Sequence, residues 1–119
     1  MTANQHEYLR GIALFNQGKF FDAHEVLEDV WRAAPHEEKK IWQGLVQVAV
    51  ALHHYSTGNR LGMRSVLVRA MQNLAGHPPQ FYGIQVSPLL KSLARWLEAF
   101  DNGQPLPSLP QIDLPRRNA

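Results

Sequence analysis

The segment from residue 41 to residue 55 constrains the fold more than any other part of the chain, because it is apolar on almost every side of a helix. A helix without a broad polar face is normally surrounded by other helices. We therefore expect an all-α protein built around one central helix over about residues 37–56. The apolar residues of this segment are Ile41, Trp42, Leu45, Val46, Val48, Ala49, Val50, Ala51, Leu52 and Tyr55.

Helix-breaking residues divide the chain into five segments, and the apolar residues within each segment recur three or four positions apart. This spacing is typical of helices that bury one face. We expect a compact bundle of five helices over about residues 2–18, 20–34, 37–56, 59–74 and 87–103. Thr2 and Gln5 predict a capping box for the first helix, and Ser87 before Pro88 predicts an N-cap for the last. The breakers are Gly18, Pro35, Gly58 and the cluster Gly76-His77-Pro78-Pro79.

Glycine and apolar positions repeat when the chain is compared with itself at an offset of forty residues. This repeat indicates two successive units, each a helix, a glycine turn and a second helix, as in tetratricopeptide-like helical hairpins. A chance similarity between two unrelated helical hairpins is the alternative interpretation. The matching pairs are Phe15 and Tyr55, Gly18 and Gly58, Phe21 and Leu61, Val26 and Val66, and Leu27 and Leu67.

The last part of the chain predicts an extended segment rather than a sixth helix, because prolines interrupt it repeatedly. We expect a single helical domain over residues 1–103, followed by a Pro-rich tail over residues 104–119 that packs on the domain or is disordered. The apolar residues that would face the domain are Leu106, Leu109, Ile112 and Leu114, and the prolines are Pro105, Pro107, Pro110 and Pro115.

Composition limits the classes of partner. With 12 Lys and Arg against 10 Asp and Glu, the formal net charge is only +2, which gives no reason to expect nucleic acid as a partner. The longest apolar stretch, residues 45–52, is far shorter than the roughly 20 residues that span a bilayer, so we expect no membrane partner. The polar first residues lack the apolar core of a secretory signal, so we expect a cytoplasmic protein. The fifth helix or the tail could form a homodimer contact.

Two polar strips are the candidate functional features. His24 and Glu28 lie one helical turn apart at the margin of an apolar face, and Trp31 follows one turn later. On the central helix, Gln43, Gln47 and His54 form the one continuous polar line. We expect His24, Glu28, Trp31, Gln43 and Gln47 to line one semi-buried polar pocket. In the alternative interpretation, the line of Gln43, Gln47 and His54 faces solvent.

The same residues allow a divalent metal site. His24 and Glu28 offer a nitrogen and an oxygen ligand, and His54 or His53 a second nitrogen, which suits Zn, Fe or Mn. Water bound to the metal could then attack an ester, amide or phosphoester, with Glu25 as the candidate general base. More specific templates are missing, because the zincin motif needs a histidine where Glu28 stands, and the chain has no Glu-x-x-His pair. A third hypothesis is a purely structural polar network, in which His24 and Glu28 bond each other and Gln43 or Gln47.

These residues also carry a resemblance to a known family. The pattern Phe15-Asn16-x-Gly18-x-Phe20-x-x-Ala23-His24-Glu25-x-x-Glu28-x-x-Trp31, followed by Gln43-Gly44-Leu45-x-Gln47-x-Ala49, resembles the bacterial domain-of-unknown-function family 309. The hallmark of that family is His-x-x-x-Glu-x-x-Trp. The resemblance covers about residues 5–75, and it implies a compact helical fold and the general label of predicted metal-dependent hydrolase. It gives added weight to His24 and Glu28 as a site and identifies no substrate.

The sequence therefore predicts a domain whose best-supported role is that of a binding module for a small ligand or a protein partner. A metal-dependent hydrolase that uses His24 and Glu28 is the second hypothesis, and the structural network is the third.

Overall fold

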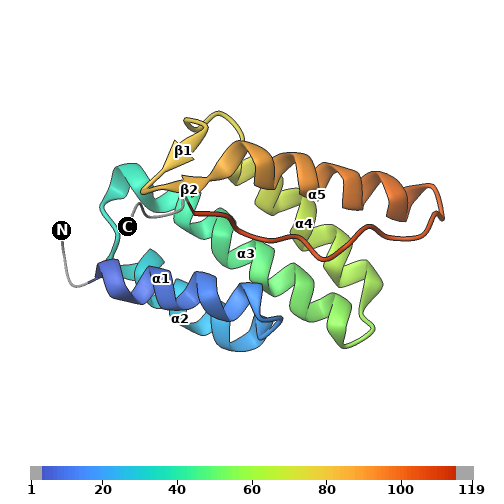
Figure 1. Cartoon of the computed structure of the whole chain (residues 1–119), viewed down its shortest axis with the longest axis horizontal. Helices are drawn as coiled ribbons and strands as arrows, with labels where there is room; N and C mark the ends of the chain where they lie inside the picture. The colour runs from blue at the N-terminus through green and yellow to red at the C-terminus, as the bar shows by residue number, and fades with distance from the viewer. Residues whose placement is uncertain (1–3, 115–119) are drawn as a thin grey trace, which may run out of the picture.

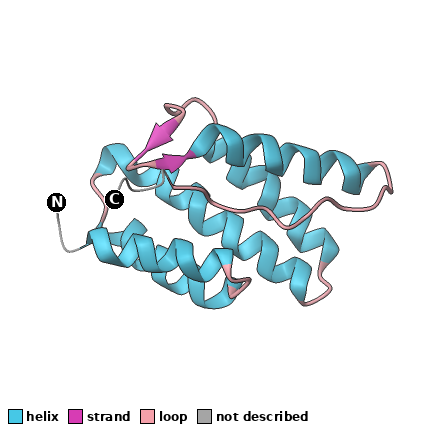
Figure 2. Cartoon of the chain, in the orientation of Figure 1, coloured by secondary structure: helices cyan, strands magenta, loops and turns pink. Residues whose placement is uncertain are grey.

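The computed structural model describes residues 4–114, with side chains from Glu7 onward, and it shows five α-helices and one very short hairpin (Figures 1 and 2). The expected all-α bundle is confirmed. The capping box predicted for Thr2 and Gln5 lies outside the described residues. The α-helices are α1 (Asn4–Asn16), α2 (Phe20–Ala33), α3 (Lys39–Ser56), α4 (Arg60–Leu74) and α5 (Val86–Asp101), with a 3₁₀ helix η1 (His36–Glu38) before α3 and strands β1 (Gln80–Phe81) and β2 (Ile84–Gln85) before α5.

Helix α3 lies at the centre of the molecule, between the α1–α2 pair and the α4–α5 pair (Figure 1). Each helix packs on the next one along the chain, as stacked helical hairpins do. This arrangement explains why α3 needs almost no polar face. None of the helices within residues 4–114 combines the length and the apolar character needed to cross a membrane. The buried residues of α3 are Ile41, Trp42, Gly44, Leu45, Val46, Val48, Ala49, Ala51 and Leu52.

The turns that end α1 and α3 have the same backbone bonding, forty residues apart. Gly18 donates to the carbonyl of Phe15 and Gly58 to that of Tyr55, at 2.9 and 3.1 Å. The next residue in each turn donates to a carbonyl five positions back, at 2.9 and 2.8 Å. This is the Schellman helix ending, and it needs the left-handed conformation that both glycines adopt, with φ of 81° and 84°. The repeat seen in the sequence is therefore present in the turns of the two hairpins.

The segment between α4 and α5 differs from the loop that the sequence predicts. It contains the antiparallel hairpin of β1 and β2, which turns through Tyr82 and Gly83, both with positive φ. The start of α5 is also one residue earlier than predicted, at Val86. The carbonyl of Pro79 accepts from the amides of Val86 and Ser87, at 2.8 and 3.2 Å, so the hairpin takes the place of the expected serine N-cap.

The Pro-rich tail, over its described residues 104–114, has no regular secondary structure and lies against the helices. It runs back past α5 in the direction opposite to that helix (Figure 1). Trp96 Nε1 donates to the carbonyl of Ser108 at 2.9 Å, and Asn16 of α1 binds Ile112, so the tail connects α5 to α1. Ile112 is buried, whereas Leu109, which was expected to face the domain, is exposed.

Candidate functional site

His24 and Glu28 form a half-buried pair on α2. One face of α2, which includes Phe20, Ala23 and Leu27, is buried, and both side chains lie at the margin of that face. His24 Nε2 lies 3.9 Å from Glu28 Oε1, and the two side chains are 24% and 31% exposed. This separation exceeds the range of a hydrogen bond. Both groups therefore keep hydrogen-bonding capacity while they are partly removed from water.

Phe21 joins this pair to α3, although the sequence analysis did not single it out as a site residue. Its ring is 50% exposed and lies between two imidazoles, 5.6 Å from the centroid of His24 and 5.4 Å from that of His53. An exposed aromatic ring between polar groups offers a flat apolar surface to a ligand. Phe21 matches Leu61 in the forty-residue sequence repeat, but this match did not indicate a site, because the repeat reflects the fold alone.

The structure does not bring the four candidate metal ligands together. Within residues 4–114, no group of three or more His, Asp or Glu side chains is placed so that it could bind one metal ion. His54 turns to the start of α4, where its Nδ1 lies 3.4 Å from Asn59 Nδ2. His24 and Glu28 alone fall short of the three protein ligands that a catalytic zinc site uses. The side chains that the structure describes thus do not fit a resident metal.

Gln43 and Gln47 lie on the partly exposed strip of α3, with Gln47 turned toward α4. Gln47 Oε1 accepts a hydrogen bond from Asn73 Nδ2 at 2.7 Å. In the described part of the chain, no hydrogen bond or ion pair connects either glutamine to His24 or Glu28. The two polar strips therefore belong to neighbouring helices without bonding each other. The sequence analysis missed Asn73, because the register between two helices leaves no local signal.

Trp31, about one helical turn after Glu28, is partly buried near the end of α2, where Lys39 contacts it. Lys39 Nζ donates to the carbonyls of Trp31 and Arg32 at 2.7 and 2.8 Å, and it lies 5.9 Å from the centroid of the indole. Cations are favourable at the carboxyl end of a helix, where carbonyls lack intrahelical partners. Lys39 thus fixes this end of the site.

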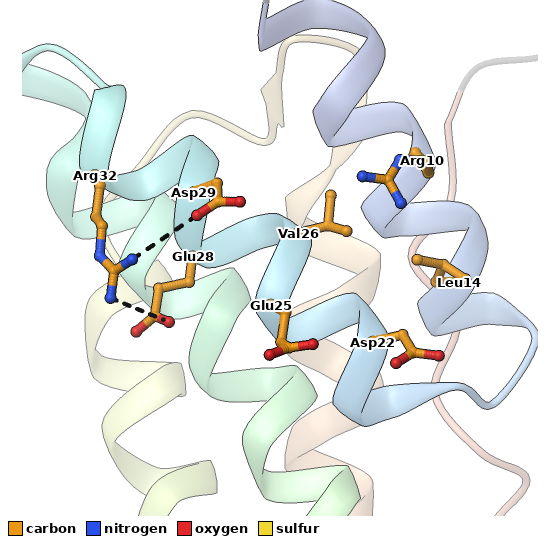
Figure 3. A pocket seen from close by; sticks show the side chains of 8 residues that line it. All are labelled: Arg10, Leu14, Asp22, Glu25, Val26, Glu28, Asp29 and Arg32. Carbon is orange, nitrogen blue, oxygen red and sulfur yellow. Dashed lines mark ion pairs between the residues drawn. The ribbon is translucent and has the colours of Figure 1, made fainter.

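The carboxylate of Glu28 also contacts Arg32, whose Nη2 lies 3.5 Å from Glu28 Oε1. On this outer side, α1 and α2 enclose an open pocket of about 490 Å³, which Figure 3 shows. Glu25, the candidate general base, is exposed and lines this outer pocket, whereas His24 does not. The pocket lining is Arg10, Leu14, Asp22, Glu25, Val26, Glu28, Asp29 and Arg32.

Comparison with known proteins finds similar proteins that are named as uncharacterized. An uncharacterized protein of Aquifex aeolicus is 36% identical over 92 residues, which are 76% of this chain and 28% of that protein. The uncharacterized protein YpuF of Bacillus subtilis is 34% identical over 56 residues, which are 46% of this chain and 32% of that protein. The matched part of the chain therefore spans less than about a third of the length of either relative.

The family model of DUF309, a domain of unknown function, matches residues 8–66. These residues cover most of α1, all of α2 and α3, and the first part of α4. Asn73, the partner of Gln47, lies beyond the match. The matched residues contain the turn that carries His24 and Glu28 together with the strip of α3. This match shows that the chain belongs to the DUF309 family.

Proposed function

We propose that this chain is a binding module whose site consists of His24, Glu28, Trp31, Gln43 and Gln47. The observation that carries the proposal is the half-buried pair of His24 and Glu28, held 3.9 Å apart. A ligand with a donor and an acceptor can bridge the imidazole and the carboxylate, and such charge-assisted hydrogen bonds are stronger than neutral ones. A small polar ligand or a segment of a partner protein has this chemistry.

The surroundings of the pair support binding over a purely structural role. Arg32, at 3.5 Å, keeps the carboxylate of Glu28 oriented from the outer side, and Phe21 adds an exposed apolar surface beside His24. A network that served the fold alone would satisfy its own polar groups. Here the imidazole and the carboxylate lie beyond hydrogen-bond range of each other.

The test is an NMR titration of the full chain with a library of small polar metabolites and with pooled peptides. We expect one class of probe to shift the signals of His24 and Gln47. Glu28→Gln should abolish that shift, whereas the matched variant Glu25→Gln, changed on the outer face one turn away, should keep it. If Glu28→Gln instead lowers the free energy of unfolding by about 1–3 kcal/mol and no probe binds the parent chain, the site is a structural network.

Elemental analysis of chain purified without chelator or affinity tag separates binding from metal chemistry. The proposal expects less than about a tenth of an equivalent of transition metal, unchanged by His24→Ala. If the chain contains a stoichiometric metal that His24→Ala removes, the binding-module proposal is wrong and the metal-dependent hydrolase is favoured.

A further inference from the structure

The chain itself shows how this fold binds an extended segment. The carboxamide of Asn16 contacts both main-chain groups of Ile112 in the tail. Asn16 Nδ2 donates to the carbonyl of Ile112 at 3.0 Å, and the amide of Ile112 donates to Asn16 Oδ1 at 2.8 Å. Ile112 is only 1% exposed, so one side-chain amide satisfies the backbone of a buried, extended residue.

The pair of Gln47 and Asn73 offers the same chemistry between α3 and α4, where no segment of the tail forms a hydrogen bond within residues 4–114. Their mutual hydrogen bond uses an Asn73 donor and a Gln47 acceptor. The amide nitrogen of Gln47 and the oxygen of Asn73 keep further capacity, since a carboxamide has two donors and an acceptor with two lone pairs. A donor and an acceptor therefore lie side by side between α3 and α4, as the carbonyl and amide of an extended residue require.

From this we propose that the ligand of the site is an extended peptide segment of another protein, bound through its main chain by Gln47 and Asn73. The proposal rests on the binding function proposed above and names its ligand class. Gln43 precedes Gln47 by four residues, which is about 6 Å along the helix. Two residues of an extended chain span about 6.6 Å. The two glutamines can therefore contact every second residue of a peptide that runs along α3.

The apolar part of the site lies farther along α3 and on its α2 side, because His53 contacts the exposed ring of Phe21 whereas Gln47 contacts Asn73 of α4. His53 follows Gln47 by six residues, or about 9 Å along α3. This axial distance alone corresponds to about three extended residues. Because the peptide must also cross α3 from the α4 side to the α2 side, we expect it to place an apolar side chain on Phe21 more than about three residues from the one that Gln47 and Asn73 bind.

The length and charge of the strip favour a peptide over other ligands. From Gln43 to His54 the strip covers twelve residues, or about 16 Å of helix from the first to the last, which an extended peptide of about five residues spans. Two lysines precede the strip on α3: Lys39 is engaged by the carbonyls of α2, and Lys40 is exposed. Glu28 contributes a carboxylate at the margin. One exposed lysine near a carboxylate is not the cluster of Lys and Arg on which recognition of polyanions depends.

The experiment is a selection of linear peptides from a display library on the full chain, with Gln47→Leu/Asn73→Leu as the counter-selection target. We expect peptides that bind the parent chain and lose about tenfold or more in affinity for the double variant. The matched control is Gln72→Leu, an exposed residue next to Asn73, which should leave the affinity unchanged. Phe21→Ser should weaken the peptides that carry an apolar residue at the expected spacing.

A scan of N-methylated peptides tests main-chain recognition on the parent chain alone, so it remains decisive if the double variant fails to fold. One N-methyl position should cost about tenfold in affinity, and its flanking positions much less. The inference is overturned if no peptide depends on Gln47 and Asn73 or on a main-chain amide. If a polar metabolite then still shifts His24 and Glu28→Gln abolishes that shift, the binding function stands without the peptide. If neither probe binds, both proposals fail.

Discussion

Single charged side chains determine how the helices of this protein end and meet. Lys39 is the first residue of α3, yet its ammonium group binds the last carbonyls of α2. This contact closes the connection between the two helices and places the charge of Lys39 over the ring of Trp31. The geometry of the α2 side of the site therefore depends on a lysine of the neighbouring helix.

Arg64 of α4 and Asp101 at the end of α5 form a second such contact, with two hydrogen bonds of 2.8 and 2.9 Å. The hydrogen bonds from Arg64 hold the pKa of Asp101 below its ordinary value. Desolvation opposes this effect, and the positive charge of Arg64 adds to it. A group whose pKa is lower in the folded than in the unfolded state stabilises the fold above its unfolded pKa. That contribution disappears as the pH falls through the folded pKa.

We therefore predict a pH-dependent effect of Asp101→Asn. At pH 7 the variant should have a lower free energy of unfolding than the parent chain, and the difference should shrink as the pH falls below the ordinary Asp pKa of about 3.9. Urea unfolding curves over a pH series measure it. Glu98→Gln, an exposed acid on the same helix, is the control and should show no such trend. A difference that stays constant down to pH 3 would exclude the ion pair as its cause.

The tail acts as a structural element although it has neither helix nor strand. We predict that Asn16→Ala lowers the free energy of unfolding by about 1–3 kcal/mol, because it leaves the amide and carbonyl of buried Ile112 without partners. Hydrogen exchange of the Ile112 amide should become faster at the same time. Gln17→Ala, at the exposed neighbouring position, should change neither quantity. Unaltered exchange at Ile112 in Asn16→Ala would show that the tail is held by its apolar contacts alone.

The helices could be predicted from the sequence because their signals are local. Apolar spacing and glycine turns identify each helix within a few residues of its own position. The short hairpin could not be predicted, since two-residue strands show no alternation and Tyr82 adopts a positive φ that its residue type does not signal. A distant contact holds it, because Tyr82 donates a hydrogen bond to Glu38 Oε2 at 2.9 Å.

One part of the candidate site could likewise be predicted from the sequence, and another part could not. The proximity of His24 and Glu28 follows from one turn of helix, so the sequence is sufficient to predict it. The bond between Gln47 and Asn73 depends on how closely α3 approaches α4. That approach is set by Gly44, where a Cβ atom would lie 2.9 Å from Leu74 and 3.3 Å from the carbonyl oxygen of Ala70. No pattern within either helix specifies this register.

At the scale of the whole molecule, each helical hairpin, α1–α2 and α3–α4, contains a glycine that packs closely against a leucine of the partner helix. Gly11 of α1 packs on Leu27 of α2, where an added Cβ would also lie 2.9 Å from the leucine side chain. Gly44 of α3 packs on Leu74 of α4 in the second hairpin. Because α3 belongs to the second hairpin and also packs on α2 of the first, the two hairpins could resist overpacking either as one body or independently.

We predict that Gly11→Ala and Gly44→Ala both destabilise the protein, although alanine normally stabilises a helix relative to glycine by about 1 kcal/mol. The added methyl group overpacks a buried contact, at a cost of about 1–3 kcal/mol, which outweighs the gain in helix propensity. Gly44→Ala should cost more, since a backbone carbonyl cannot move aside as a leucine side chain can.

The double variant Gly11→Ala/Gly44→Ala shows whether the two helical hairpins respond to overpacking independently or as one body. If each hairpin absorbs its own strain, the losses in the free energy of unfolding should add within about 0.5 kcal/mol, as they do for sites without shared partners. Ala94→Gly, at an exposed position of α5, calibrates helix propensity without packing. A double variant that loses much less than the sum would mean that α3 shifts as a rigid body to relieve both contacts. In that case the bond between Gln47 and Asn73 would change whenever the first hairpin is altered, and the site would depend on the packing of every helix around α3.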